Sequence, residues 1–319
     1  MSLRAILLLS ALAASCATPT AAPTAASTIA SPSEVYLQVL GVAQDAGYPQ
    51  SGCYKEHCQR AWHNLAKRRA VSCLAVVDPE HSSKFLFDAT PDMPEQLQML
   101  QQLAPDADFD LDGVFLTHGH IGHYTGIMFF GREAQGSQAV PVHVMPRMSR
   151  FLAENGPWSQ LVALGNIQLL ALADQRATTL NSNLSVTPLL VPHRDEFTET
   201  VGFLIRGPQK TALYLPDIDK WDRWRIDIRD LLEDVDYAFL DATFFAADEL
   251  PGRNMSEIPH PYVEESFALF ADLPAALKAK VWFIHFNHTN PLLIEGSAAQ
   301  KLVEQKGFHV ARQGLRLPM

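Results

Sequence analysis

The sequence has little basic charge. Its 319 residues include 25 lysines and arginines against 35 aspartates and glutamates, which gives a net charge of -10 that is spread without long charged runs. Contacts with the phosphates of nucleic acids need a basic face. The composition therefore argues against nucleic acid as a partner, and we expect a small-molecule substrate.

Long apolar runs and short repeats are missing as well. After the N-terminal segment, no stretch approaches the roughly 18 uninterrupted apolar residues of a membrane span, and no motif recurs at a fixed short period. Hydrophobic residues make up 47% of the chain and charged residues 19%. These values are typical of a soluble enzyme built as one large domain with two main layers.

The N-terminus is typical of a targeting segment. Arg4 precedes an apolar run from Ala5 to Ala14, and small residues then lead to Cys16. Such a run is too short to span a bilayer, so we predict a signal peptide over residues 1–16. Its end, Leu12-Ala13-Ala14-Ser15-Cys16, resembles a bacterial lipoprotein cleavage box, with Ala13 where leucine is usual.

This segment also predicts location. Cleavage before Cys16 would leave a lipidated cysteine, and residues 17–33, rich in Ala, Thr, Ser and Pro, would form a flexible tether. The folded domain is then expected over residues 34–319. Ala17 carries no retention signal, so we expect a periplasmic protein whose lipid anchor in the outer membrane is its one membrane contact. The alternative is a secreted soluble protein.

Hydrophobic patterning predicts an α+β fold. Predicted helices and strands do not alternate strictly, which fits a parallel doubly wound sheet poorly and fits two face-to-face sheets with helices outside, a four-layer αββα sandwich. We predict strands at 35–41, 71–77, 84–88, 113–116, 140–144, 166–171, 184–190, 200–206, 211–215, 236–240, 281–284 and 308–310. We predict helices at 93–103, 123–131, 146–154, 220–233, 261–272 and 294–305.

A dense histidine cluster follows the apolar run 113–116. His118, His120 and His123 lie within six residues. Neutral imidazole is the commonest metal ligand, and a tight loop after a strand can direct all three side chains to one place. The spacing indicates a metal site.

These residues resemble the His-x-His-x-Asp-His signature of the metallo-β-lactamase superfamily, which implies the αββα fold. In that family the first two histidines serve one metal, and the Asp and last His serve another. Here Gly122 stands at the Asp position. The resemblance implies a second site that is empty, weaker or completed from elsewhere. A Gly122→Asp change is then expected to strengthen that site.

The remaining ligands are expected after later strands. His193, Asp217 and His285 each follow an apolar run, in the order that the resemblance implies. We assign His118, His120 and His193 to the first site. The reduced second site would contain His123, Asp217 and His285. Zn²⁺ is the expected cofactor, with one ion tightly bound and a second weaker or absent, and iron is the alternative metal.

A closer resemblance is to the pyrroloquinoline quinone biosynthesis protein B family. It rests on Val39-Leu40-Gly41, Gly47-Tyr48-Pro49-Gln50, Cys53 and Cys58, and on the segment His285 to Leu292. His260 matches a further histidine of that family. The family's opening motif has a third cysteine where this chain has Lys55, and its members keep the Asp that is Gly122 here while losing most of the His-x-His part.

The cysteines Cys53 and Cys58 have two expected roles. In an oxidising periplasm they could close a short disulfide loop. The resemblance implies instead a structural metal held together with His57, with Cys73 or another residue as the fourth ligand. Neither role is catalytic.

The expected function is that of a metal-dependent hydrolase. A metal-bound hydroxide would attack an ester, lactone, amide or phosphoester. Asp217 would bridge the metals or orient the nucleophile, and His288, three residues beyond His285, is a candidate to compensate for the missing Asp. Two alternatives stay open: an iron-dependent oxidative enzyme related to quinone cofactor biosynthesis, and a non-catalytic metal-binding lipoprotein.

Overall fold

The computed structural model describes residues 34–105 and 110–319. The predicted signal peptide (1–16) and tether (17–33) lie outside the described residues. Among the residues that are described, no helix has both the length and the apolar character needed to cross a membrane.

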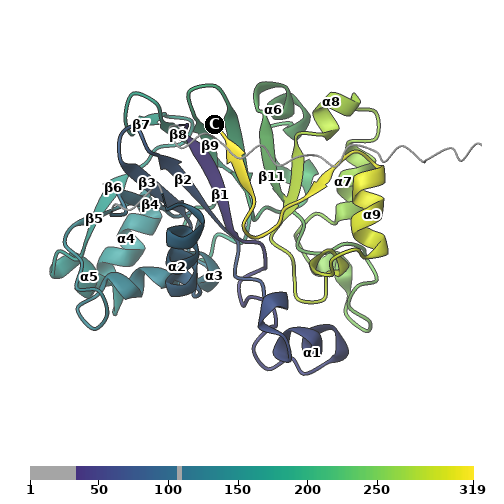
Figure 1. The fold of residues 1–319 in the computed structure, drawn as a ribbon, viewed down its shortest axis with the longest axis horizontal. Helices are drawn as coiled ribbons and strands as arrows, with labels where there is room; N and C mark the ends of the chain where they lie inside the picture. The colour runs from purple at the N-terminus through teal and green to yellow at the C-terminus, as the bar shows by residue number, and fades with distance from the viewer. Residues whose placement is uncertain (1–33, 106–109) are drawn as a thin grey trace, which may run out of the picture.

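The described strands form two seven-stranded sheets that lie against each other (Figure 1). In spatial order, the first sheet contains β14 (Arg316–Pro318), β1 (Tyr36–Gly41), β2 (Cys73–Asp78), β3 (Ser83–Phe87), β4 (Gly113–Phe115), β5 (Val140–Val144) and β6 (Ile167–Ala171). The second contains β13 (His309–Val310), β12 (Val281–Ile284), β11 (Tyr237–Asp241), β10 (Thr211–Leu215), β9 (Val201–Arg206), β8 (Ser185–Leu190) and β7 (Thr178–Thr179).

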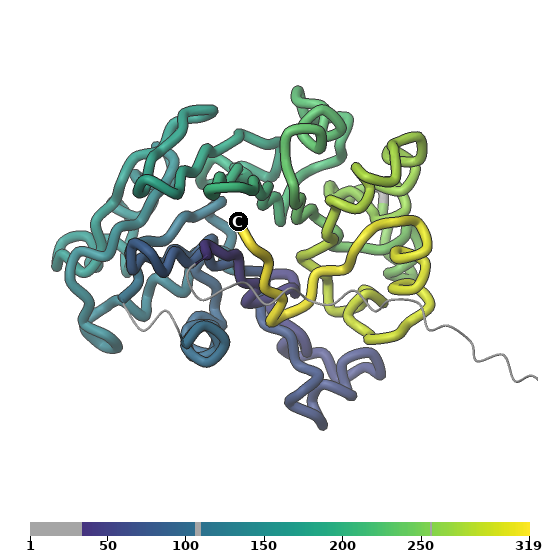
Figure 2. The backbone as a smooth tube through the Cα atoms, turned by 45° about the horizontal axis from the view of Figure 1, so that its top comes forward, coloured from purple at the N-terminus to yellow at the C-terminus, as the bar shows by residue number. Residues whose placement is uncertain are grey.

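Both sheets change from antiparallel to parallel pairing halfway across. In the first sheet the pairs from β14 to β3 are antiparallel and those from β3 to β6 are parallel. In the second, the pairs from β7 to β10 are antiparallel and those from β10 to β13 are parallel. Figure 2 shows the C-terminal segment, in yellow, returning to the first strand, in purple, where β14 pairs with β1.

Helices lie on the outer faces of the two sheets (Figure 1), so the predicted αββα sandwich is confirmed. Beside the first sheet are α2 (Met93–Leu103), α3 (Ile121–Tyr124), α4 (Pro146–Glu154) and α5 (Trp158–Ala163). Beside the second are α6 (Ile228–Asp234), α7 (Val263–Leu269), α8 (Ala275–Lys278) and α9 (Ala298–Gln305). The short α1 (Glu56–Trp62) projects from the rest of the molecule (Figure 1).

Alternation along β1 divides the core into two layers. Leu37 and Val39 belong to the apolar cluster that lies between the sheets, whereas Tyr36 and Leu40 belong to the cluster under α2 and α4. Successive side chains of a strand point to opposite faces, so a strand buried on both faces supplies both layers. Burial of each large side chain stabilises the fold by about 1.5–3 kcal/mol.

Aromatic rings join the two sheets at their centre. Phe87 and Phe115 stack with ring centroids 5.0 Å apart, and each lies edge-on to Phe203 of the opposite sheet at 5.6 Å. All three side chains are fully buried. This contact fixes β3 and β4 against β9, and the loops that follow β4 and β3 approach the second sheet.

Most predicted elements are present, with shifted ends. The predicted helix 220–233 is a 3₁₀ turn (Trp221–Arg223) followed by α6, which begins where the Asp227 side chain accepts the backbone N–H of Arg229. The predicted helix 123–131 is α3 followed by a 3₁₀ helix (Thr125–Phe130). The helices α1, α5 and α8 and the strands β7 and β14 were not predicted, because each is too short for a periodic pattern. Further 3₁₀ turns cover Leu65–Lys67, Met255–Glu257 and Pro291–Leu293.

Candidate metal centre

The candidate ligands lie in loops that follow strands of the same direction. In the first sheet, β2 is antiparallel to both β1 and β3, so β1 runs parallel to β3 and β4. In the second sheet, β9 is antiparallel to both β8 and β10, so β8 runs parallel to β10, β11 and β12. The C-terminal ends of these strands therefore share one edge in each sheet. The ligands that follow them are Asp45 (after β1), His118, His120 and His123 (after β4), His193 (after β8), Asp217 (after β10) and His285 (after β12).

The first ligand group contains the three histidines that the sequence assigned to one site, together with Asp217. One ligand atom of each residue lies within 4.8 Å of the others. His118 Nε2 is 2.9 Å from His120 Nδ1 and 3.4 Å from Asp217 Oδ2. His193 Nε2 is 3.3 Å from Asp217 Oδ1. The geometry brings together a three-histidine set with a carboxylate beside it.

The outward ring nitrogens of this group are held by neighbouring oxygens. Such contacts fix the orientation of an imidazole and leave its other nitrogen free for a metal. The pairs are Thr117 Oγ1 with His118 Nδ1 (3.0 Å), Asp219 Oδ1 with His193 Nδ1 (3.3 Å) and Glu196 Oε2 with His120 Nε2 (3.0 Å).

The second ligand group contains His123, His285 and Asp217, as predicted, and a fourth residue, Asp45. His123 Nε2 is 3.2 Å from Asp45 Oδ1 and 3.3 Å from His285 Nε2. Asp217 Oδ2 is 3.7 Å from His123 Nε2. Asp217 thus belongs to both groups, and its Oδ2 lies near a histidine of each.

Asp45 was missed from the sequence because it lies far from the histidine motif. Its position is nonetheless coupled to Gly122: a Cβ added at Gly122 would lie 2.4 Å from both the Cα and the Oδ1 of Asp45. The space beside the motif glycine is therefore occupied by another residue's carboxylate. A side chain at position 122 would meet the backbone of Asp45, so Gly122→Asp cannot add a ligand without displacing Asp45.

The outward nitrogens of the second group are held in the same way. Asp88 Oδ2 lies 2.8 Å from His123 Nδ1, and Thr243 Oγ1 lies 2.9 Å from His285 Nδ1. Asp88 and His285 both adopt left-handed backbone angles, with φ of 69° and 67°. Such angles cost a non-glycine residue roughly 1–3 kcal/mol, and here they occur where the chain leaves β3 and β12 to enter the site.

Asp217 is held by a further pair. His260 Nδ1 lies 3.1 Å from Asp217 Oδ1 and 2.8 Å from Asp241 Oδ2. Asp241 in turn accepts the hydroxyl of Thr243, which contacts His285. All of these side chains are buried. The arrangement connects the shared carboxylate to the ligands of the second group.

Protonation follows from this burial. Burial, and then His123, hold the pKa of His118 well below its usual range. Burial alone would raise the pKa of Asp217, but His193 and His260 outweigh it and hold the pKa well below normal. Burial acts to lower the pKa of His123, yet Asp88 and Asp45 raise it well above its ordinary value. A metal that binds at His123 must therefore displace a proton.

These residues fit a metal ion. Three buried ligand atoms, Asp45 Oδ1, His193 Nε2 and Asp217 Oδ1, make no hydrogen bond of good geometry. An unpaired buried polar atom costs about 1–3 kcal/mol, and a cation between these atoms would remove that cost. Imidazole and carboxylate donors suit zinc and iron.

The remaining predicted site residues lie in a separate cluster. Cys53 Sγ is 3.2 Å from His57 Nε2, and the rings of His57 and His288 are 5.3 Å apart. These three residues form a candidate ligand group that shares no member with the two groups around Asp217. His288, the candidate to compensate for the missing Asp, thus lies beside His57 and belongs to neither group around Asp217. Burial, and then His57 and Lys55, lower its pKa to about 4.

The predicted disulfide is not formed. Cys53 and Cys58 are free thiols, and Cys58 is buried in α1. Burial raises the pKa of Cys58 to about 11. Of the ligands in the alternative expectation, Cys53 and His57 lie together in a candidate ligand group, His288 is its third member, and neither Cys58 nor Cys73 belongs to it.

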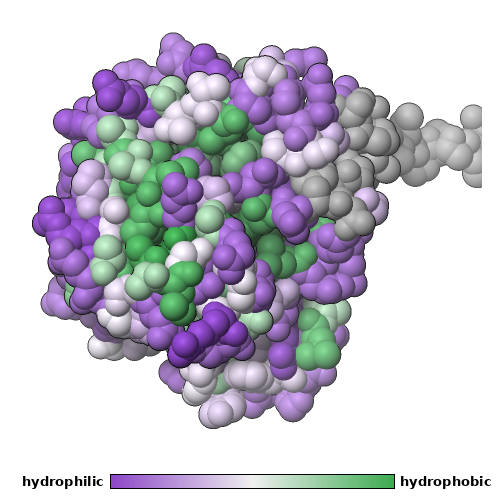
Figure 3. All heavy atoms as spheres, turned by 90° about the vertical axis from the view of Figure 1, so that its left-hand side faces the viewer, coloured by the Kyte–Doolittle hydropathy of each residue, from purple (hydrophilic) through white to green (hydrophobic). Residues whose placement is uncertain are grey.

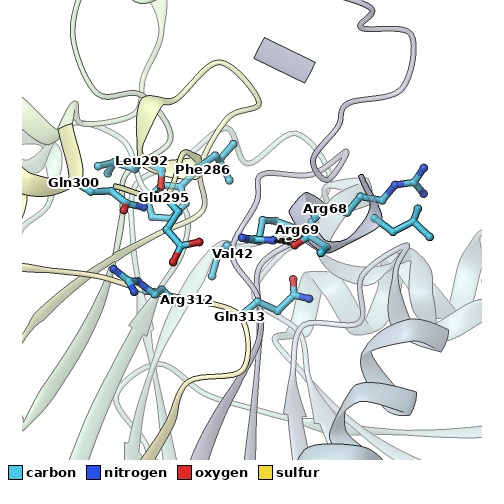
Figure 4. Close-up of a pocket in the computed structure, with 13 residues that line it drawn as sticks. Val42, Arg68, Arg69, Phe286, Leu292, Glu295, Gln300, Arg312 and Gln313 are labelled. Atoms are coloured by element: carbon cyan, nitrogen blue, oxygen red, sulfur yellow. Dashed lines mark hydrogen bonds between the residues drawn. The ribbon is translucent and has the colours of Figure 1, made fainter. Parts of the chain in front are cut away.

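A pocket of about 430 Å³ contains none of these ligands in its lining, although it includes Phe286, which directly follows His285. Figure 4 shows Arg68 and Arg69 on one side of it and Glu295 and Arg312 on the other, and none of the lining residues belongs to either ligand group. The surface close to His120 has a different character. Its neighbour Ile121 is 66% exposed, and Phe197, next to Glu196, is 59% exposed.

Apolar side chains also gather on the face that carries α4 and α5. Figure 3 shows this face, with hydrophobic atoms in its middle and hydrophilic atoms around them. Phe197 lies 5.7 Å from Phe151 of α4, ring to ring. The two rings lie among charged side chains, including Arg147, Arg150 and Glu196, in a hollow between α4 and the loop that carries Glu196.

Known proteins resemble this chain over most of its length. Residues 83–286 match the family model described as the beta-lactamase superfamily domain. Coenzyme PQQ synthesis protein B of Methylobacterium sp. (strain 4-46) is 29% identical over 307 residues, which cover 88% of this chain and 99% of that protein. The protein of the same name from Xanthomonas campestris pv. campestris (strain B100) is 27% identical over 313 residues, with 88% and 99% covered.

Two solved structures agree with the fold. Zn²⁺-bound PqqB from Methylobacterium extorquens matches with a TM-score of 0.74 and 25% identity, covering 89% of this chain and all (100%) of that one. A diphosphatase from the PhnP family matches with a TM-score of 0.62 and 22% identity, covering 90% and 97%. At that identity the second likeness concerns the fold alone.

Proposed function

The chain belongs to the beta-lactamase superfamily, and on that premise we propose that it is a metal-dependent hydrolase. Its similarity to coenzyme PQQ synthesis protein B, expected from the motifs, is confirmed as well. The observation that carries the proposal is the shared Asp217. Its carboxylate reaches histidines of both groups: Oδ1 lies 3.3 Å from His193 Nε2, and Oδ2 lies 3.4 Å from His118 Nε2 and 3.7 Å from His123 Nε2. A carboxylate between two ligand groups suits a pair of metal ions.

The residues divide into two sets of ligands. His118, His120 and His193 would hold one ion. His123 and His285 would hold the other, and Asp217 would contact both. A divalent metal at such a site lowers the pKa of bound water, which supplies a nucleophile for an ester, lactone, amide or phosphoester at neutral pH.

The chain's own residues orient this chemistry. His260 is fixed by its hydrogen bond with Asp241 and lies 3.1 Å from Asp217 Oδ1, so a buried imidazole stands beside the shared carboxylate. Asp88 and Asp219 orient the rings of His123 and His193. The exposed Ile121 and Phe197 provide an apolar approach beside His120, which suits a substrate with an apolar portion.

A panel of chromogenic substrates tests the proposal. The zinc-loaded chain is assayed against esters, lactones, phosphodiesters and β-lactams, beside His193→Ala. The control is His143→Ala. His143 is a buried histidine of β5 that stacks on Phe115 of β4 and belongs to no candidate ligand group. We expect turnover of at least one class, lost in the His193 variant and kept in the control. A fully metal-loaded chain with no turnover in any class would contradict the proposal.

A second candidate function is oxidative chemistry with iron. The second group contains two histidines and two carboxylates, Asp45 and Asp217. His123, His285 and one of these carboxylates would make the two-histidine, one-carboxylate set of many non-haem Fe(II) oxygenases, and the similarity to coenzyme PQQ synthesis protein B supports this reading. Metal analysis after purification without added metal separates the candidates. Bound iron together with oxygen consumption favours oxidation, and bound zinc without oxygen consumption favours hydrolysis.

We also propose that the mature protein is attached by Cys16 to the outer membrane, facing the periplasm. The support is the sequence of residues 1–33. Cys16→Ser should release soluble protein or block processing. Recovery of the wild-type chain from the cytoplasm with Met1 still attached would refute the anchor.

A further inference from the structure

We infer that Asp45 is the carboxylate ligand of the second metal and takes over the role that the motif position 122 has lost. This inference rests on the proposed metal site but not on hydrolysis. It replaces a reduced second site by a complete one with four ligands, namely Asp45, His123, Asp217 and His285.

Steric exclusion is the first argument. A Cβ at position 122 would lie 2.4 Å from Asp45 Cα and 2.8 Å from Asp45 Cβ. Contacts this short force the backbone at position 45 to move, because Cα cannot rotate away as a flexible side chain could. A side chain at 122 and a carboxylate from position 45 therefore cannot both occupy this space. Glycine at position 122 leaves the space that the Asp45 carboxylate occupies.

The environment of the Asp45 carboxylate is the second argument. Its Oδ1 is 3.2 Å from His123 Nε2 and 3.8 Å from His285 Nε2, yet this buried atom makes no hydrogen bond of good geometry. A buried carboxylate oxygen without a well-oriented hydrogen bond thus faces two imidazole nitrogens of the same candidate ligand group.

The loop that carries Asp45 is the third argument. The Gln44 N–H donates to Phe286 O at 2.8 Å, directly after the ligand His285, and the Gly47 N–H closes a turn onto Gln44 O at 2.8 Å. Gly47 has a φ of 71°, which favours glycine. The turn is therefore tied to the loop of another ligand, and Asp45 lies at its apex in a defined position.

Metal stoichiometry tests this inference independently of turnover. The full chain is stripped with a chelator, reloaded with Zn²⁺ and analysed for bound metal, and affinity is measured by competition with a chromophoric chelator. We expect two equivalents for the wild type. Asp45→Asn should keep one equivalent and weaken the second by roughly 100-fold. The control is Asp92→Asn, which alters the nearby carboxylate that accepts the Val71 N–H and belongs to no candidate ligand group.

A second variant removes no ligand at all. Gly122→Ala adds one methyl group, which should displace Asp45 and reduce the bound metal from two equivalents to one. If Gly122→Ala and Asp45→Asn both retain two equivalents with wild-type affinity, the inference is overturned. If either variant unfolds, as judged by far-UV circular dichroism, the other decides. A chain that loses one metal in these variants but hydrolyses nothing supports the inference and refutes the proposed hydrolase.

Discussion

The two ligand groups share Asp217 but are built in different ways. The first takes two of its histidines, His118 and His120, from a single loop and adds His193. The second takes one residue from each of four loops, after β1, β4, β10 and β12. The motif contains His118 and His120 of the first group, whereas His193 comes from a later loop. In the second group, the carboxylate beside the motif glycine comes from the loop after β1, which is separated from β4 by β2 and β3 in the same sheet.

This difference shows what a spacing pattern can record. A local motif identifies ligands that lie on one loop. It cannot identify a ligand that comes from a second loop, which lies beside the first only in the folded protein. In the motif alone, Gly122 indicates that a carboxylate ligand has been lost. Beside Asp45 it is the residue that makes room for a carboxylate.

The largest effect is expected for the residue that the groups share. Asp217→Ala should abolish tight binding of both metals, because its carboxylate contacts ligands of both groups. Metal analysis after equilibration with Zn²⁺ measures this. Asp236→Asn, which changes a partly exposed carboxylate paired with Lys210, is the control and should bind as the wild type. Loss of only one metal from Asp217→Ala would show that Asp217 serves a single group.

A smaller, one-sided effect is expected for His193. His193→Ala should remove the metal of the first group and leave the second bound, which is the reverse of Asp45→Asn. The same should hold for His118→Ala and His120→Ala. Co²⁺ substitution makes the comparison visible, because the absorption spectrum that remains in His193→Ala should differ from the one that remains in Asp45→Asn. Identical residual spectra would contradict two distinct groups.

A still smaller effect is expected where a residue acts through a ligand. Asp88→Asn keeps the shape of the side chain but weakens the contact that orients His123. We expect the second metal to bind roughly 10–100-fold more weakly. The first should be weakened less, because Asp88 reaches His118 only through the Thr117 hydroxyl. Chelator competition gives both affinities. An equal loss at both groups would indicate a general disturbance of the fold.

The last prediction concerns the free energy of unfolding and not metal binding. It involves Glu249, which supports the loop after His285. The Phe245 N–H and the Thr289 hydroxyl donate to it, and burial raises its pKa from 4.5 to about 7. The folded state therefore holds this proton more tightly than the unfolded chain. Its stabilising contribution is present below the unfolded pKa and is lost as the pH rises through the folded pKa.

Denaturation at two pH values measures this contribution. Between pH 4 and pH 8 the wild type should lose on the order of 2 kcal/mol more unfolding free energy than Glu249→Gln. Parallel stability curves for the two proteins would contradict the raised pKa.

The fold was predictable because its main strands and helices are long enough to show a hydrophobic periodicity in the sequence. The central strands and helices such as 93–103 and 146–154 carry clear periodic patterns, and the structure has them at those positions. Short elements such as α1 and α8 have too few turns to show a period. Their ends depend on caps and tertiary contacts, as with Asp227 at the start of α6.

The site was predictable only where a histidine or an aspartate directly follows an apolar strand. His193, Asp217 and His285 each follow an apolar strand, and the fold brings all three to the centre. His288 follows the same rule in sequence, yet the chain turns it towards His57 and Cys53. Asp45 follows β1 by several residues, so its position depends on a turn that is tied to Phe286 and not on the strand itself.

The central claim is that two metals flank Asp217, with Asp45 as a ligand of the second. A crystal structure of the zinc-loaded chain, with anomalous diffraction at the zinc edge, tests it most directly. The claim predicts two anomalous peaks, one among His118, His120 and His193, and one in contact with Asp45, His123 and His285. A single peak at the first group, with Asp45 turned away from His123, would contradict it.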